Sequence, residues 1–303
     1  MYVADMHCDT AAELLRGGSL VNRYNFSEKY PQLQIAAIFS SAKGKSREER
    51  LGYSCRLTEK INEECARLGL PLVTDKKSLC ECVGRGESLV ILSIEGGGGL
   101  FADSEELTTL YERGVRVIGP IWDTNELGTS CSDNVDVGLT ENGRKFIRKL
   151  DQMQIIIDIS HASDRSFWEI AELSRKPFIA THSCFREVAE HPRNLTKDMA
   201  NEISSRGGVV GLSLYPPHLS GKSFADFSDI FRQIDYAIEN FGEKFLGFGF
   251  DIDGTDGEYP DGIDESGSIH DAVIDKLLSR YGKSITERLC GKNVIECFLR
   301  SMS

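Results

Sequence analysis

The stretch that decides the fold is Gln154-Ile155-Ile156-Ile157-Asp158-Ile159-Ser160-His161, a short run of β-branched residues that ends in polar groups. Its first isoleucines do not alternate with polar residues, which is typical of a parallel strand buried on both faces. Ser163 or Asp164 follows as a candidate N-cap of a helix. The stretch therefore predicts one strand–helix unit of a parallel α/β sheet, with His161 at the carboxyl end of the strand.

Similar apolar runs recur through the chain. We expect eight strands, at residues 2–7, 34–41, 88–95, 115–122, 154–161, 177–183, 208–214 and 244–251. The intervals between them favour amphipathic helices, as in residues 224–241, and Thr196 is a candidate N-cap for a helix that ends at Gly207-Gly208. Alternating strands and helices form either a doubly wound sheet or a closed barrel, and eight units favour the (β/α)₈ TIM barrel. We expect extra helices within residues 44–87 and 269–303, and a single domain over residues 1–303.

Composition and charge argue against two classes of partner. The chain has 303 residues, with 47 acidic and 35 basic side chains and a formal net charge of −12. Nucleic-acid binding needs a basic surface, so we expect no nucleic-acid partner. The sequence lacks both a long apolar run and the pattern of a signal peptide, so we expect no membrane partner and no secretory leader. Nine cysteines without a CxxC pair indicate reduced thiols and a cytoplasmic protein.

Histidine and carboxylate side chains stand at the ends of five predicted strands. These residues are His7, Asp9, Glu95, His161, His182 and Asp251. The carboxyl ends of all strands in a parallel barrel open on one face, so we expect these side chains to converge. A single histidine at a strand end is often only a hydrogen-bonded core residue, but imidazoles and carboxylates together are the ligands of zinc-like ions. The joint pattern therefore predicts a metal site.

The residues divide naturally between two ions. Glu95 has two carboxylate oxygens and could bridge them, which leaves His7 and Asp9 for one ion and His161 and His182 for the other. Two ions roughly 3.5–4 Å apart can share a hydroxide and make it a nucleophile at neutral pH. The sequence contains neither a G-x-S-x-G nor an H-E-x-x-H motif, so a serine triad or a helix-borne zinc site is disfavoured.

Five motifs together resemble the membrane (renal) dipeptidase family, which comprises binuclear zinc metallopeptidases with an amidohydrolase-like barrel. The motifs are His7-Cys8-Asp9-Thr10, Ser93-Ile94-Glu95-Gly96-Gly97, Asp158-Ile159-Ser160-His161-Ala162-Ser163, Ala180-Thr181-His182-Ser183 and Gly247-Phe248-Gly249-Phe250-Asp251-Ile252-Asp253-Gly254. The resemblance covers nearly all of the chain. It implies two Zn²⁺ ions that are bridged by Glu95 and a hydroxide, with His7 and Asp9 on one ion and His161 and His182 on the other.

The same resemblance implies roles for four residues around the substrate. Arg193 matches the arginine that holds the carboxylate of a dipeptide, and a guanidinium suits that planar group. Asp251 matches the catalytic aspartate that binds the free amine and passes a proton to the leaving group. Tyr215 resembles a residue that lines the pocket. Trp122 stands where studied relatives have a substrate-contacting histidine, and its indole offers one N–H donor and no protonatable nitrogen.

The function predicted is a zinc-dependent dipeptidase, which hydrolyses the peptide bond of dipeptides. Two alternatives stay open: another amide hydrolase, acting on N-acyl amino acids or cyclic amides, or a catalytically idle barrel that binds small peptides. The resemblance also suggests a homodimer.

Overall fold

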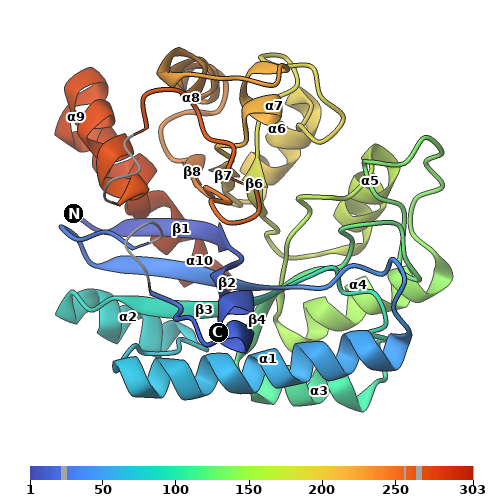
Figure 1. Cartoon of the computed structure of the whole chain (residues 1–303). Helices are drawn as coiled ribbons and strands as arrows, with labels where there is room; N and C mark the ends of the chain where they lie inside the picture. Colours follow the sequence, from blue (N-terminus) through green and yellow to red (C-terminus); the bar gives the residue numbers. More distant parts are fainter. Residues whose placement is uncertain (22–25, 256, 264–267, 303) are drawn as a thin grey trace.

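A parallel sheet forms the centre of the computed structural model, which describes residues 1–21, 26–255, 257–263 and 268–302. Eight strands pair in the order β5-β4-β3-β2-β1-β8-β7-β6, and all of their pairings are parallel (Figure 1). The strands are β1 (Val3–Cys8), β2 (Gln32–Phe39), β3 (Leu89–Glu95), β4 (Val115–Gly119), β5 (Ile156–Ile157), β6 (Ala180–Ser183), β7 (Val210–Leu212) and β8 (Leu246–Phe248). Each falls within or overlaps one predicted strand.

Two backbone hydrogen bonds join the β5 and β6 segments, which stand first and last in this strand order, and so close the sheet. The amide of Ile159 donates to the carbonyl of Ile179 at 2.9 Å, and the amide of Ile179 donates to the carbonyl of Ile157 at 3.0 Å. These bonds connect the residues just after β5 with those just before β6, where Asp158 and Ile179 form an isolated parallel bridge. The predicted (β/α)₈ architecture is therefore confirmed.

Most strands end earlier than the sequence predicted. β4 ends at Gly119, directly before Pro120, which has no amide hydrogen to donate to a neighbouring strand. β5 contains only Ile156 and Ile157. The amides of Asp158 and Ile159 still donate to the backbone of neighbouring strands, but the amide of Ser160 turns to the Asp158 side chain. Apolar composition predicted the buried run, but a proline in one strand and a side-chain hydrogen bond in the other mark where regular pairing stops.

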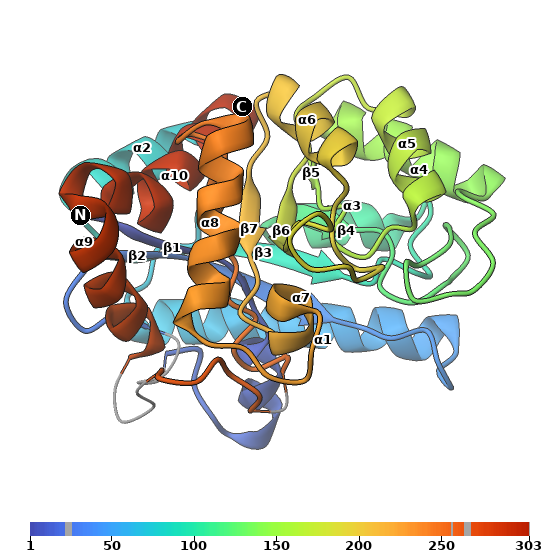
Figure 2. The same ribbon diagram turned by 90° about the horizontal axis from the view of Figure 1, so that it is seen from above.

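Helices surround the barrel (Figure 2). They are α1 (Arg47–Leu68), α2 (Lys76–Arg85), α3 (Glu105–Glu112), α4 (Glu141–Met153), α5 (Asp164–Leu173), α6 (Lys197–Ser205), α7 (Pro216–Ser220), α8 (Phe227–Phe241), α9 (Ile269–Glu287) and α10 (Asn293–Ser301). The extra helices expected after the second strand are α1 and α2, and those expected at the C-terminal end are α9 and α10. Among the described residues between β1 and β2, only a 3₁₀ helix, η1 (Thr10–Arg16), interrupts the loop.

Two predicted helix caps are confirmed, and one predicted helix begins later than its apolar spacing indicated. Ser163 accepts a hydrogen bond from the amide of Ser166 and begins α5, and Thr196 accepts one from Met199 and begins α6. Residues 224–226, by contrast, lie outside α8, because Asp226 forms a capping box there. A capping side chain satisfies amide groups that the first turn leaves unpaired, so it fixes the helix start more strongly than apolar spacing does.

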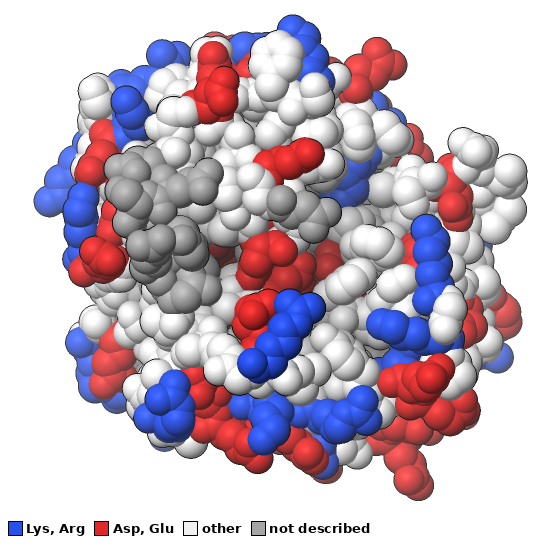
Figure 3. All heavy atoms as spheres, viewed as in Figure 1, with Lys and Arg blue, Asp and Glu red and all other residues white. Residues whose placement is uncertain are grey.

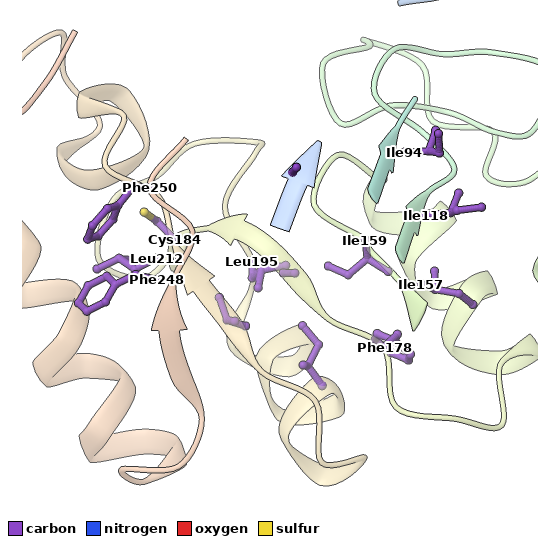
Figure 4. Packing of buried hydrophobic residues seen from close by; sticks show 14 of the residues in the cluster. Ile94, Ile118, Ile157, Ile159, Phe178, Cys184, Leu195, Leu212, Phe248 and Phe250 are labelled. Atoms are coloured by element: carbon purple, nitrogen blue, oxygen red, sulfur yellow. The ribbon is translucent and has the colours of Figure 1, made fainter. Parts of the chain in front are cut away.

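Side chains alternate between the two faces of the strands and build two apolar layers. Outward-facing residues pack beneath the helices, and Figure 4 shows Ile94, Ile118 and Ile157 along the neighbouring strands β3, β4 and β5. Leu89 and Ile91 point to the opposite face, into the barrel, and belong to a second, smaller cluster together with residues of α2 and α10. Glu95 lies on the same face of β3 as these two residues. The alternation therefore places its carboxylate inside the mouth of the barrel.

Two further observations concern the chain as a whole. None of the helices within the described ranges is long and apolar enough to cross a membrane. None of the nine cysteines, all of which lie within the described ranges, forms a disulfide bond.

Candidate active site

The residues at the carboxyl ends of the strands converge on Glu95. Its Oε1 atom lies 2.8 Å from Nε2 of His161 and 3.4 Å from Nε2 of His182. Its Oε2 atom lies 3.6 Å from Nε2 of His7, which is itself 3.7 Å from Oδ1 of Asp9. The two oxygens of one carboxylate thus face two different sets of side chains.

Unsatisfied polar atoms in this cluster provide a test of whether it suits a metal. Nε2 of His7 and Oδ1 of Asp9 are buried and have no hydrogen-bond partner. Burying a polar group without a partner costs free energy, so such atoms in a folded chain call for a ligand. Nitrogen and carboxylate oxygen donors of this kind are the ones that bind zinc. The residues present therefore fit a metal centre.

Burial and neighbouring charges shift the pKa values of the side chains in this cluster, some upwards and others downwards. Burial would lower the pKa of His7, but the adjacent carboxylates of Glu95 and Asp9 outweigh burial and raise that pKa well above its ordinary value. The pKa of His182 is well below its ordinary value, because of burial first and the neighbouring cations His7 and Arg193 second. Burial also raises the pKa of Asp9 to about 6. The cluster thus holds more negative charge than the cationic side chains of the chain neutralise.

A pocket of about 530 Å³ opens over the cluster. Figure 3 shows acidic side chains gathered in a hollow near the middle of this face, with basic side chains beside them. The predicted residues that line the pocket are Asp9, Trp122, Glu95, His161, His182, Tyr215 and Asp251. Sequence reasoning missed other lining residues, namely Ala12, Glu13, Arg16, Phe39, Tyr53, His218, Asp253 and Gly254. Glu13 and Arg16 lie shortly after the first strand, and this position could have identified them from the sequence. Tyr53 extends from α1, and no feature of the sequence indicated that it lines the pocket.

The pocket is acidic on one side and aromatic on another. Trp122 packs edge-on against Phe39, with 4.7 Å between ring centroids, and lies 5.9 Å from the ring of His161. Tyr215 makes an edge contact with His218 at 4.9 Å. These rings give the pocket apolar area next to the candidate metal ligands, which suits a ligand with both charged groups and side chains.

Asp251 and Asp253 have different environments although they are two residues apart. Asp251 has a φ of 56°, in the left-handed region, and its Oδ1 atom lies 3.9 Å from Nε2 of His7. Burial, followed by nearby acidic groups, raises its pKa well above the ordinary value. Asp253 instead accepts hydrogen bonds from the amide of Asp9, at 2.8 Å, and from the hydroxyl of Thr10. Asp253 therefore holds the loop after β1, and Asp251 faces the cluster.

Arg193 is close to the cluster but is held by the chain itself. Its Nη1 donates to Oγ of Ser183 at 2.7 Å and its Nη2 donates to the carbonyl of His182 at 2.7 Å. It is 6% exposed and is absent from the residues that line the pocket, and its Nε has no hydrogen-bond partner. The structure therefore does not place Arg193 with the other predicted substrate residues, and its binding to a substrate carboxylate stays a prediction.

The chain forms a closed parallel barrel, and imidazoles and carboxylates gather at the carboxyl mouth of that barrel. This fold and this site together define the class of barrel hydrolases that hold a metal. The profile of the membrane dipeptidase family (Peptidase family M19) matches residues 1–300, so this chain belongs to that family. The resemblance noted from the motifs is thereby confirmed, as is the expectation of a hydrolase that acts on peptide bonds. Membership also implies a metal cofactor. Two groups of side chains place possible ligand atoms within 4.8 Å of one another, namely His7, Glu95 and His182, and His7, Asp9 and Asp251.

Individual relatives and solved structures agree with this assignment. An uncharacterised protein in the pqqA 5′ region of Klebsiella pneumoniae is 31% identical over 215 residues, which cover 67% of this chain and 79% of that protein. Dipeptidase 3 of Homo sapiens is 29% identical over 230 residues, which cover 73% of this chain and 46% of that protein. The match thus spans less than half of the human relative.

Two crystal structures have the same fold over nearly the whole chain. One is a dipeptidase of family M19, with a TM-score of 0.86 and 24% identity over 100% of this chain and 99% of that chain. The other is a metallopeptidase from Rhodobacter sphaeroides, solved with a phosphinate mimic of L-Ala-D-Ala, with a TM-score of 0.80 and 20% identity over 99% of each chain.

Proposed function

We propose that this protein is a zinc-dependent dipeptidase. His7 and Asp9 would hold one zinc ion, His161 and His182 would hold the second, and Glu95 would bridge them. Two zinc ions bound there would supply a hydroxide nucleophile at neutral pH and stabilise negative charge on the carbonyl oxygen of the scissile bond.

One observation carries this assignment. The Glu95 carboxylate directs Oε1 towards His161 and His182 and Oε2 towards His7. A carboxylate that served a single ion or a simple hydrogen bond would not need both oxygens to face separate sets of nitrogen ligands. The buried, unpaired atoms of His7 and Asp9 support the same reading, because they lie beside the second oxygen.

The substrate groups would be bound by residues around this centre. Asp251 faces the cluster in a pocket with excess negative charge, which suits a free ammonium group, and it would pass a proton to the leaving amine. Arg193 would hold the C-terminal carboxylate through its unpaired Nε or by releasing Ser183. Trp122 and Tyr215 would contact the side chains of a dipeptide.

The experiment that tests this function compares four substrates on zinc-replete protein: a dipeptide, its N-acetyl form, a cyclic amide and a decapeptide. We expect hydrolysis of the dipeptide and little release of residues from the decapeptide. Equal activity on the N-acetyl form or a preference for the cyclic amide would instead identify a different amide hydrolase. His182→Ala is the inactive control, and zinc below about one ion per chain would favour an idle binding barrel.

A further inference from the structure

The hydroxyl of Thr181 lies between the two candidate metal sites. Thr181 is fully buried on β6, and its Oγ1 lies 2.9 Å from Nδ1 of His182 and 3.4 Å from Nδ1 of His7. The rings of His7 and His182 are in contact, with 3.9 Å between centroids and a tilt of 36° between their planes. One hydroxyl therefore contacts a ligand of each proposed zinc ion, on the side of the ring that faces away from Glu95.

A carboxylate determines how this hydroxyl is oriented. Oγ1 of Thr181 lies 2.6 Å from Oδ2 of Asp158. An ionised carboxylate can only accept hydrogen bonds, so the hydroxyl hydrogen of Thr181 points to Asp158. The hydroxyl of Ser160 also lies 3.2 Å from Oγ1 of Thr181, but it donates its own hydrogen to Oδ1 of Asp158 at 2.6 Å. The lone pairs of the Thr181 oxygen are then left for the imidazoles, which can donate only through their N–H groups.

Asp158 is held too firmly by the chain to act as a metal ligand itself. Its Oδ1 accepts from the amide of Ser160 at 3.0 Å, the hydroxyl of Ser160 at 2.6 Å and the amide of Thr181 at 2.9 Å. Both carboxylate oxygens are therefore occupied by donors from β6 and from the loop after β5. This arrangement fixes the carboxylate and, through it, the direction of the Thr181 hydroxyl.

We propose that Asp158 and Thr181 are positioning residues that keep a hydrogen on Nδ1 of both His7 and His182, so that both Nε2 lone pairs face Glu95. A histidine ligand is commonly oriented in this way by a hydrogen-bond acceptor at its other ring nitrogen. Here a single hydroxyl serves one ligand of each site, so it couples the two sites. This inference rests on the proposed function, because it assigns a purpose to ligands of two zinc ions.

Zinc affinity tests the proposal without using activity. Thr181→Val keeps the shape of the side chain but removes the hydroxyl, and loss of such a partner typically weakens metal binding about 10- to 100-fold. We expect that loss for both ions, measured by competition with a chelator, and we expect Thr181→Ser to restore most of the affinity. Ser93→Ala is the matched control, since it removes a buried hydroxyl of β3 that donates to the carbonyl of Ala36 rather than to Asp158, Thr181 or an imidazole.

A second measurement uses the unsubstituted protein, so it holds even if Thr181→Val does not fold. Nitrogen-15 NMR of the metal-free chain should show neutral His182 with its hydrogen on Nδ1. Hydrogen on Nε2, or equal losses of zinc affinity in Thr181→Val and Ser93→Ala, would overturn the proposal. If the unsubstituted protein bound no zinc at all, the proposed function would fail instead, which separates the two outcomes.

Discussion

The carbonyl oxygen of Thr181 packs so closely against Gly249 that a Cβ atom at residue 249 would lie 1.7 Å from it. Gly211 on β7 meets the same oxygen, and its Cβ would lie 2.0 Å away. Both contacts involve backbone, which cannot rotate out of the way as the end of a long side chain can. The two glycines therefore let β6 approach β7 and β8, and this approach places His182 and Thr181 in the site.

Gly249→Ala should damage both the fold and the metal centre, because β6 must move to make room for the methyl group. We expect a loss of about 1 to 3 kcal/mol in the free energy of unfolding, measured by urea titration, together with weaker zinc binding. Gly84→Ala is the control, since a Cβ at that position in α2 meets nothing within 4 Å. Alanine there should leave zinc binding unchanged and stabilise the helix by about 0.5 to 1 kcal/mol. Unaltered zinc binding in Gly249→Ala would show that β6 is not held by this contact.

Asp251→Asn should retain zinc and fold but lose turnover of dipeptides, because an amide cannot donate or accept a proton as a carboxyl group does. A positioned acid or base contributes roughly 10²- to 10⁴-fold, so kcat should fall by at least about 100-fold. The matched variant is Asp253→Asn, which weakens the hydrogen bonds to the amide of Asp9 and the hydroxyl of Thr10. That change should lower stability by about 1 to 2 kcal/mol. Equal kcat values for the two variants would contradict the separate roles of these carboxylates.

Trp122 should contribute apolar area rather than a hydrogen bond. Trp122→Phe is expected to keep kcat within about 3-fold, whereas Trp122→Ala should raise KM by up to about 10-fold, because an aromatic pair such as that with Phe39 contributes about 0.5 to 1.5 kcal/mol. Steady-state kinetics on one dipeptide measures both changes. Loss of kcat in Trp122→Phe would show instead that the indole N–H is needed.

Metal removal should make the stability of the chain depend on pH. The pKa of His7 is raised well above 6.5, so the stability it contributes is complete below that pH and is lost as pH rises through the folded-state value. Asp251, whose pKa is also raised, acts in the same direction. In a chelator, the free energy of unfolding should therefore fall between pH 6.5 and about 8, by at most about 2 kcal/mol for each proton that only the folded chain retains.

Zinc should reverse this trend, because its ligands bind it only after they lose their protons. The increase in melting temperature caused by a fixed zinc concentration should thus become larger between pH 6.5 and about 8. Calorimetry with and without chelator at both pH values measures this. An increase that shrinks with pH would contradict metal binding at these residues, and Glu95→Gln, which weakens the bridging carboxylate, should show a smaller increase at either pH.

The side chains that the sequence predicted as metal ligands come together in the structure because these residues stand at or just after strand ends, and their binding of metal stays a prediction. In a parallel barrel this position alone places His161 and Glu95 at one mouth, whatever the connecting helices do. Predictions about the pocket walls were poorer. Tyr53 lies on α1 and His218 on α7, and no local pattern tells which face of a helix or loop will cover a distant strand end.

Sequence by itself determined the order of strands and helices, the parallel sheet and the kinds of groups at its mouth, because apolar runs and polar strand ends are local properties. Only the tertiary structure decided that the two oxygens of Glu95 face different histidines, that Thr181 lies between His7 and His182, and that Arg193 is held by Ser183. These relationships depend on contacts of a few ångströms between residues far apart in the chain. Such contacts are set by how closely the strands pack, and that is fixed only when the barrel closes.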